Sequence, residues 1–277
     1  MRLASFTRAG SPGFGVVTEE GIRDLSGTGH ASLRAALVAS LDFQSAAASA
    51  PLVPVESVRW LPPTWDSDRN VMVGLNYRTH IEEMGREFPP HPMLFIRWSD
   101  SFVGSGSAIV RPTVSRRFDF EGEFAVVIGR GGRHIPESEA MAHVAGFTCV
   151  NDGTMRDFQR HTTQYFPGKS FWHSGSAGPW LVTPDETGPY RLLGIETRLN
   201  GEVMQQARLD DLVFDVERLI AYVSTIITLQ PGDLISTGTT GGVGDARDPQ
   251  VYLQPGDVVE VTVDRIGTLR NTVVDEA

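Results

Sequence analysis

Acidic residues alternate along one segment of the chain, the run DFEGEFAVVIG. Asp119, Glu121 and Glu123 are spaced by two, and on a strand this spacing puts all three carboxylates on one face. Such a face is usually solvated, but residues 124–128 are continuously apolar, so we expect this strand to enter the core with its acidic end lining a cleft. A hard divalent cation such as Mg²⁺ or Mn²⁺ would relieve the repulsion between the carboxylates. Asp152, which ends the apolar run AGFTCVND, is the best candidate for a further ligand, because chemistry gathers where strands pass into loops.

A histidine and a glutamate lie three residues apart in the run NYRTHIEEMG. On a helix His80 and Glu83 would share one face, where the carboxylate could orient the imidazole and support it as a general base. A surface histidine beside a glutamate is common, so the pair alone is weak evidence. The next segment, GREFPPHP, is rich in glycine and proline, as a mobile loop that closes a site would be. The pair is therefore interpreted as part of a lid.

Further polar residues follow Asp152. Arg156 and Gln159 are suited to hold a carboxylate or a keto oxygen. Lys169 is the only lysine among 24 basic residues, which makes it harder to interpret as generic surface charge. The run STGTTGGVGD lacks the ending of a phosphate-binding loop, so a nucleotide site is rejected there. Its glycines would instead let the backbone pass close to a ligand, with the Thr239 hydroxyl as a donor.

Other kinds of site are disfavoured. The remaining histidines show no metal-binding spacing, and no G-x-S-x-G run indicates a serine hydrolase. Cys149 lies inside an apolar run and is interpreted as a small core residue.

The pattern of strands and helices expected from the sequence changes near residue 60, which divides the chain into two parts. Residues 1–60 predict a small antiparallel meander with a glycine turn at SPGFG, a helix over residues 31–40 and a linker at QSAAASAPLVP. From residue 70 onward apolar runs separated by glycine and proline turns predict a mainly β domain. Two helices interrupt it, one over residues 211–229 and one at PESEAMAHVA. We therefore expect a mainly β, α+β protein with a small N-terminal domain (1–60) and a catalytic domain (61–277).

Composition excludes several partners. The 24 basic and 34 acidic residues give a net charge of −10, which disfavours nucleic acid. No apolar run approaches the length of a membrane span, and the start MRLASFTRAG lacks the plan of a signal peptide. One cysteine cannot form an internal disulfide, so a cytoplasmic location is expected.

In combination, these segments resemble the fumarylacetoacetate hydrolase family over about residues 71–274. The blocks that carry the resemblance follow one another in the family's order: VGLNYRTHIEE, DFEGEFAVVIG, GFTCVNDGTMRDFQ, PGKSF, GPWLVT, LNGE, LQPGDLISTGT and GVGD. The small N-terminal domain matches the family's longer bacterial members.

The resemblance implies a mixed β-sandwich roll and a homodimer. It also implies one Mg²⁺ or Mn²⁺, with Ca²⁺ as an alternative, held by Glu121, Glu123 and Asp152. A catalytic dyad of His80 and Glu83 would lie on a closing lid. The residues implied around a 2-oxo acid substrate are Arg156, Gln159, Lys169 and Thr239, with Lys169 or Arg156 balancing the charge that develops during catalysis.

Three positions depart from the common bacterial pattern. Arg97 stands where F-x-K is usual, Thr240 replaces the proline of T-G-T-P, and FWHSGSAGPW replaces F-D-x-x-x-P-x-G-P-W. Because the segment after Lys169 lies beside the pocket in this family, these departures put the identity of the substrate in doubt. Trp172 and His173 are candidates for shaping access to the site.

Family members act on 2-oxo acids, and a cation stabilises the enolate that forms when a bond at C3 breaks. We favour hydrolysis of a carbon-carbon bond in an acylpyruvate-like diketo acid of the fumarylpyruvate or fumarylacetoacetate type, in aromatic or sugar-acid catabolism. Both dyad members are present to activate water. Decarboxylation of oxaloacetate or isomerisation of a 2-hydroxymuconate-type dioate is the alternative. A third hypothesis is an inactive relative that binds a 2-oxo acid.

Overall fold

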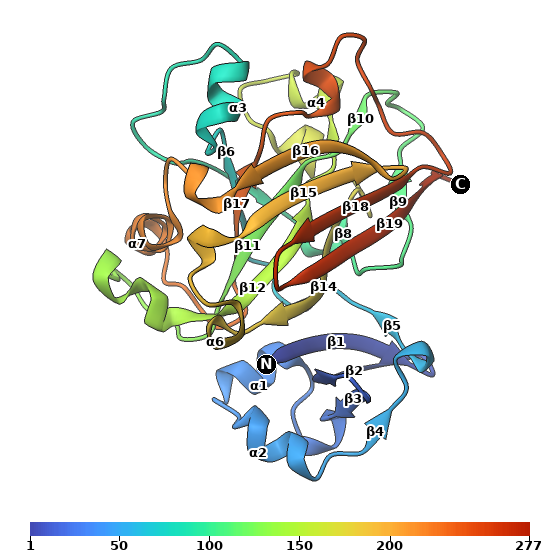
Figure 1. Ribbon diagram of the computed structural model, residues 1–277, viewed down its shortest axis with the longest axis vertical. Helices are drawn as coiled ribbons and strands as arrows, with labels where there is room; N and C mark the ends of the chain where they lie inside the picture. Colours follow the sequence, from blue (N-terminus) through green and yellow to red (C-terminus); the bar gives the residue numbers. More distant parts are fainter.

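Strands dominate the computed structural model, which describes residues 1–277. The mainly β fold with some helix that the sequence predicts is confirmed. A 12-stranded sheet and a 5-stranded sheet pack against each other, and a two-stranded sheet joins β10 (Phe118–Asp119) to β13 (Thr154–Met155). The N-terminal part lies at one end of the molecule and the helix α3 (Arg78–Glu83) at the other (Figure 1).

The N-terminal part is a meander with two short helices. Its first strand pairs with β14 (Gly175–Val182), through Arg2 opposite Val182, so this part extends the large sheet. Its elements are β1 (Arg2–Arg8), β2 (Ser11–Thr18), β3 (Gly21–Asp24), α1 (Leu33–Val38), α2 (Phe43–Ala48), β4 (Leu52–Val53) and β5 (Arg59–Trp60).

Two predictions for this part are wrong. SPGFG is not a turn but lies in β2, and the chain reverses at Ala9 and Gly10, which both have positive φ. Gly15 is required for another reason, since a Cβ there would lie 2.3 Å from the carbonyl oxygen of Arg23 on the neighbouring strand. The expected linker contains α2, because Asp42 caps it by accepting a hydrogen bond from the Ser45 N–H at 3.1 Å.

The large sheet continues from β14 through β12, β11, β17 and β6 to the edge strand β7. The bounds of these strands and of β8, which pairs with β14, are β6 (Asn70–Gly74), β7 (Met93–Arg97), β8 (Phe102–Val103), β11 (Gly122–Ile128), β12 (Val144–Asn151) and β17 (Leu234–Thr239). Every residue of β11 is buried, which explains its unbroken apolar run.

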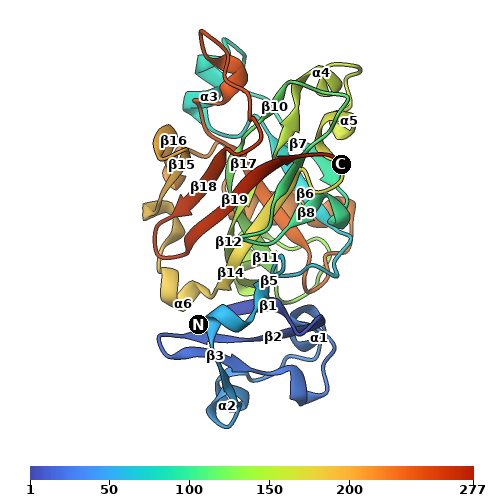
Figure 2. The ribbon, with the colours of Figure 1, turned by 90° about the vertical axis from the view of Figure 1, so that its right-hand side faces the viewer.

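The second sheet covers one face of the first (Figure 2). Burial alternates along β15 and β18, and their inner residues Ile195, Val261 and Val263 join the main core, which also contains Phe124, Phe147 and Tyr190. Burial raises the pKa of the Cys149 thiol, in the same core, to about 12. The strands of this sheet are β9 (Ile109–Arg111), β15 (Gly194–Leu199), β16 (Glu202–Arg208), β18 (Val258–Val263) and β19 (Gly267–Asp275).

The helices are few and short. The expected helix over residues 211–229 is α7 (Val216–Ile226), which begins only after Asp215 caps it. PESEAMAHVA forms a 3₁₀ helix over Glu137–His143 instead of an α-helix. The longest helix, α7, has 11 residues, and none of the helices combines the length and the apolar composition of a membrane span. The remaining helices are α4 (Arg156–Gln159), α5 (Phe166–Lys169) and α6 (Pro184–Thr187).

Asp233, in the turn between α7 and β17, predicts a pH-dependent stability. Burial raises the pKa of its carboxyl to about 6, although the Gln230 N–H and the guanidinium groups of Arg69 and Arg34 act in the opposite direction. A raised acid pKa means that the folded state binds the proton more tightly, so this group favours folding at low pH and ceases to as pH rises from about 4 to 6. Asp233→Asn should therefore improve thermal stability relative to the wild type more at pH 7.5 than at pH 5. If the difference in Tm between the variant and the wild type is the same at both pH values, the raised pKa of Asp233 is contradicted.

Candidate metal centre

Three buried carboxylates meet at one end of the large sheet. β11 and β12 are antiparallel, with Gly122 opposite Asn151, and the Asp152 N–H donates to the Glu121 carbonyl at 2.8 Å. This register brings Glu121, Glu123 and Asp152 together, with one oxygen of each within 4.8 Å of the others. The structure thus brings together the three residues that the resemblance implies as ligands.

Asp119 does not share their face. It lies in the separate strand β10, so the alternation is broken between Asp119 and Glu121. Its carboxylate accepts hydrogen bonds from the N–H groups of Gly244 and Asp245 and from Arg156 Nε, at 2.8, 2.9 and 2.8 Å. The expectation of three carboxylates on one strand face is therefore wrong, and Asp119 instead positions Arg156.

Three buried cations surround two of the carboxylates. Lys169 Nζ lies 2.7 Å from Glu121 Oε2 and 2.6 Å from Asp152 Oδ2. Arg156 Nη1 lies 2.6 Å from Glu121 Oε1, and Arg97 Nη1 lies 2.5 Å from Asp152 Oδ1. Burial alone would raise the pKa of Glu121, but Lys169 and Arg156 lower it to about 2. Asp152 and Glu121 in turn raise the pKa of Lys169 against the effect of burial, so its ammonium group stays charged.

Glu123 lacks such a cation. Its carboxylate accepts hydrogen bonds from the Ser236 hydroxyl and from the Gly238 N–H. Burial, followed by repulsion from Asp152 and Glu121, raises its pKa well above the ordinary value. A divalent ion within reach of all three carboxylates would relieve this repulsion, and oxygen ligands are what Mg²⁺, Mn²⁺ and Ca²⁺ prefer. The residues present therefore fit such an ion.

Arg97 is a residue whose role sequence reasoning misjudged. It is fully buried beneath Asp152, where Nη1 donates to the Gly153 carbonyl at 2.9 Å and Nη2 to Ser174 Oγ at 2.7 Å. A Cβ at position 175 would lie 2.7 Å from this guanidinium, so Gly175 makes room for it. Arg97 and Ser174 thus support Asp152, and the cavity is lined neither by them nor by Thr240, Trp172 or His173. The bearing of these departures on the identity of the substrate stays a prediction.

This contact predicts that Arg97→Gln weakens ion binding. A neutral glutamine would leave the Asp152 carboxylate without its charged donor and could not also reach Ser174, so Asp152 would lose its fixed orientation. Loss of a group that orients a ligand typically lowers metal affinity by about 10- to 100-fold. Titration calorimetry with Mn²⁺ measures the change, and an unaltered affinity in a folded variant would show that Arg97 does not position Asp152.

The histidine and glutamate lie together on α3, over the carboxylates. His80 Nδ1 is 3.3 Å from Glu83 Oε2, and the Gly242 N–H also donates to Glu83. Asn76, just before α3, fixes its base by accepting from the Phe214 N–H at 2.8 Å and donating to the Thr237 carbonyl at 2.8 Å. Nothing in the local sequence distinguishes Asn76, because its partners are distant in the chain.

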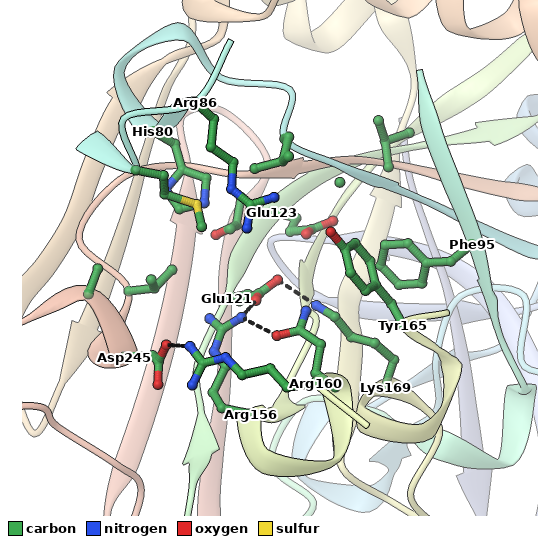
Figure 3. A pocket seen from close by; sticks show the side chains of 18 of the residues that line it. His80, Arg86, Phe95, Glu121, Glu123, Arg156, Arg160, Tyr165, Lys169 and Asp245 are labelled. Carbon is green, nitrogen blue, oxygen red and sulfur yellow. Dashed lines mark hydrogen bonds and ion pairs between the residues drawn. The ribbon is translucent and has the colours of Figure 1, made fainter. Parts of the chain in front are cut away.

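A cavity of about 330 Å³ opens between α3 and the carboxylates (Figure 3). Among the predicted site residues, Glu83 and Asp152 do not line it, and those that do are His80, Glu121, Glu123, Arg156, Gln159, Lys169 and Thr239. Sequence reasoning missed other lining residues, which include Arg86, Phe95, Arg160, Tyr165 and Asp245.

Thr239 differs from its expected role. Its hydroxyl donates to the Gly122 carbonyl at 2.9 Å and accepts from Gln205 Nε2 at 2.8 Å, so its proton is engaged within the protein. Gln205 also accepts from the Gly122 N–H at 2.9 Å and thereby ties β16, β11 and β17 together.

Comparison with known proteins identifies the family. The fumarylacetoacetate hydrolase C-terminal family matches residues 69–274, and the Rv2993c-like N-terminal family matches residues 1–63. The chain belongs to the fumarylacetoacetate hydrolase family. The resemblance inferred from the sequence blocks is therefore confirmed.

Relatives in this family differ in activity. The chain is 39% identical over 276 residues to a 2,4-didehydro-3-deoxy-L-rhamnonate hydrolase of a Sphingomonas species, covering 99% of this chain and 96% of the relative. It is 41% identical over 236 residues to the mitochondrial oxaloacetate tautomerase Fahd2a of Rattus norvegicus, covering 85% and 75%. Hydrolases and tautomerases thus share this scaffold.

Solved structures of the family have the same fold. A fumarylacetoacetate hydrolase from Exiguobacterium antarcticum superimposes with a TM-score of 0.90 at 34% identity, covering all of both chains. A maleylpyruvate hydrolase from Sphingobium sp. SYK-6, in complex with a manganese(II) ion and pyruvate, gives 0.82 at 25% identity, also over all of both chains. Divalent metal binding therefore occurs in the family.

Proposed function

We propose that this protein is a hydrolase that depends on a divalent metal and cleaves a carbon-carbon bond in an acylpyruvate-like 2,4-dioxo acid. The observation that carries the proposal is the position of His80, oriented by Glu83, over the same cavity as the carboxylates of Glu121 and Glu123. A site that only bound a 2-oxo acid would need the ion but not a base opposite it.

The ion would be Mg²⁺ or Mn²⁺ held by Glu121, Glu123 and Asp152, and when bound it would supply positive charge that favours an enolate. Arg97 and Lys169 hold Asp152 in place, and Lys169 and Arg156 hold Glu121. These contacts orient both ligand carboxylates, and those to Glu121 lower its pKa and keep it ionised.

In the proposed reaction His80 removes a proton from water through Nε2, because Nδ1 faces Glu83. The hydroxide attacks the distal carbonyl carbon, and the bond between that carbon and C3 breaks. Its electron pair passes to the pyruvate fragment as an enolate, which then takes a proton at C3, and the distal fragment leaves as a carboxylic acid. Arg156 and Gln159, which are hydrogen-bonded to each other at 3.1 Å, would bind the carboxylate of the 2-oxo acid.

The second candidate is tautomerisation or decarboxylation of a 2-oxo dioate such as oxaloacetate. The oxaloacetate tautomerase relative favours the first of these reactions. Neither reaction consumes an activated water. A panel of 2-oxo-4-acyl acids, followed by loss of the enol absorbance with and without Mg²⁺ or Mn²⁺, tests the proposal. Cleavage that depends on the metal supports hydrolysis, whereas an enzyme that only tautomerises or decarboxylates oxaloacetate contradicts it.

We further infer a cytoplasmic homodimer that acts in aromatic or sugar-acid catabolism. The resemblance to the family supports the dimer, and the rhamnonate hydrolase relative supports the class of pathway. A mass of 30.2 kDa in solution, that of one chain, would contradict the dimer.

A further inference from the structure

One basic side chain in the cavity has no acidic partner. Arg86 lines the cavity, but it forms no ion pair and its guanidinium makes no hydrogen bond to the protein. Every other basic residue that lines the cavity is paired, and the pairs are His80 with Glu83, Arg156 with Asp119 and Glu121, Arg160 with Asp245, and Lys169 with Glu121 and Asp152. Arg86 is therefore the only basic residue of the cavity whose positive charge no acidic group of the protein offsets.

The end of α3 fixes where Arg86 lies. The Arg86 N–H donates to the Ile81 carbonyl at 3.1 Å, and the Gly85 N–H donates to the Glu82 carbonyl at 2.9 Å. With Gly85 at a φ of +61°, these two bonds form the Schellman ending of a helix. Arg86 is thereby tied to the helix that carries His80, and Figure 3 shows both side chains reaching into the cavity from the same side.

The groups for the 2-oxo acid end of a substrate lie opposite. Arg156 and Lys169 approach from the other side of the cavity, with the carboxylates between them and Arg86 (Figure 3). A substrate whose 2-oxo carboxylate lies beside Arg156 would present its distal end to α3. A guanidinium matches a carboxylate through two parallel hydrogen bonds, so a free arginine at this end favours a second carboxylate.

We propose that Arg86 binds the distal carboxylate of the substrate, so that the enzyme selects 2-oxo dicarboxylates over the corresponding monocarboxylates. This inference rests on the proposed function, because it takes the 2-oxo acid end to lie at the carboxylates and Arg156. It also joins recognition to catalysis, because Arg86, which would bind the distal carboxylate, is hydrogen-bonded to the end of the helix that carries His80.

The test compares fumarylpyruvate, a dicarboxylate, with acetylpyruvate, a monocarboxylate. Arg86→Gln should lower kcat/KM for fumarylpyruvate by about 10- to 100-fold, the scale of a lost hydrogen bond to a charged group, and change that for acetylpyruvate by less than about threefold. Arg86→Lys should retain part of the selectivity. Arg78→Gln is the matched control, because Arg78 is an exposed arginine of α3 that does not line the cavity.

Two results would overturn the inference. An equal fall with both substrates would mean that Arg86 only supports α3, and a changed Mn²⁺ affinity without a change in selectivity would mean that it only offsets the charge of the carboxylates. Calorimetry separates this inference from the proposed function if the wild type cleaves neither compound. Mn²⁺-loaded protein should bind 2-oxoglutarate more tightly than 2-oxobutyrate, and Arg86→Gln should remove the difference; no preference in the wild type would refute the role of Arg86.

Discussion

Removal of the divalent ion should abolish turnover of every 2-oxo acid substrate, and added Mg²⁺ or Mn²⁺ should restore it. Without the ion, Glu123 has no ion-pair partner, and the charges of Arg156 and Lys169 are already paired with carboxylates of the protein. Glu123→Gln should lower the Mn²⁺ affinity by about 100-fold or more, beyond the usual effect of losing a group that only orients a ligand. Activity after dialysis against EDTA and calorimetry with Mn²⁺ measure the two effects.

Glu56→Gln is the control for this experiment, because Glu56 is an exposed carboxylate of the N-terminal part. It should leave both the ion affinity and the activity unchanged. Full turnover by protein shown to be free of metal would refute the assignment of Glu121, Glu123 and Asp152.

The second large effect is expected at His80. His80→Ala should lower acylpyruvate cleavage by about 100-fold or more, the usual scale for losing a general base. Decarboxylation of oxaloacetate should fall less, because it requires no hydroxide and depends mainly on the carboxylates and their ion. Glu83→Gln should act like His80→Ala but more weakly, since the imidazole stays in place and only its charged partner is lost. Steady-state kinetics with both substrates measure the ratio.

His30→Ala serves as the control, since His30 lies in the N-terminal part and does not line the cavity. If His80→Ala leaves acylpyruvate cleavage within about threefold of the wild type, far from the loss expected for a base, the hydrolytic mechanism is wrong. The tautomerase or decarboxylase hypothesis would then replace it.

The carboxylates could be found from the sequence because local rules place them. Glu121 and Glu123 precede an apolar run that only a buried strand explains, and Asp152 follows the next long strand, which pairs with the first. The position expected for Asp119 was wrong because residues 120–121 belong to no strand, and β10 pairs with β13 instead of continuing into β11. The periodicity of the sequence does not reveal this break. Asp42 is a residue type that favours a helix N-cap and so indicated α2, but the small residues that follow it were interpreted as a linker.

Other residues of the site could not be predicted. A fully buried arginine such as Arg97 has the same local pattern as a surface arginine, and only its contacts with Asp152 and Ser174 reveal its place. Arg86 is exposed in a segment rich in glycine and proline, and its significance comes from its place in the cavity without an acidic partner. Both roles depend on how residues distant in the chain are arranged in space.

The most direct measurement is turnover of fumarylpyruvate by the Mg²⁺-loaded enzyme in water enriched in ¹⁸O. Hydrolysis forms a new carboxylate from the distal carbonyl group, so mass spectrometry should find one solvent oxygen in the released fumarate in addition to any exchange measured without enzyme. His80→Ala should lose this product in parallel with its loss of rate. Conversion of the substrate to an isomer or tautomer, with no cleavage and no solvent oxygen in a new carboxylate, would contradict the account.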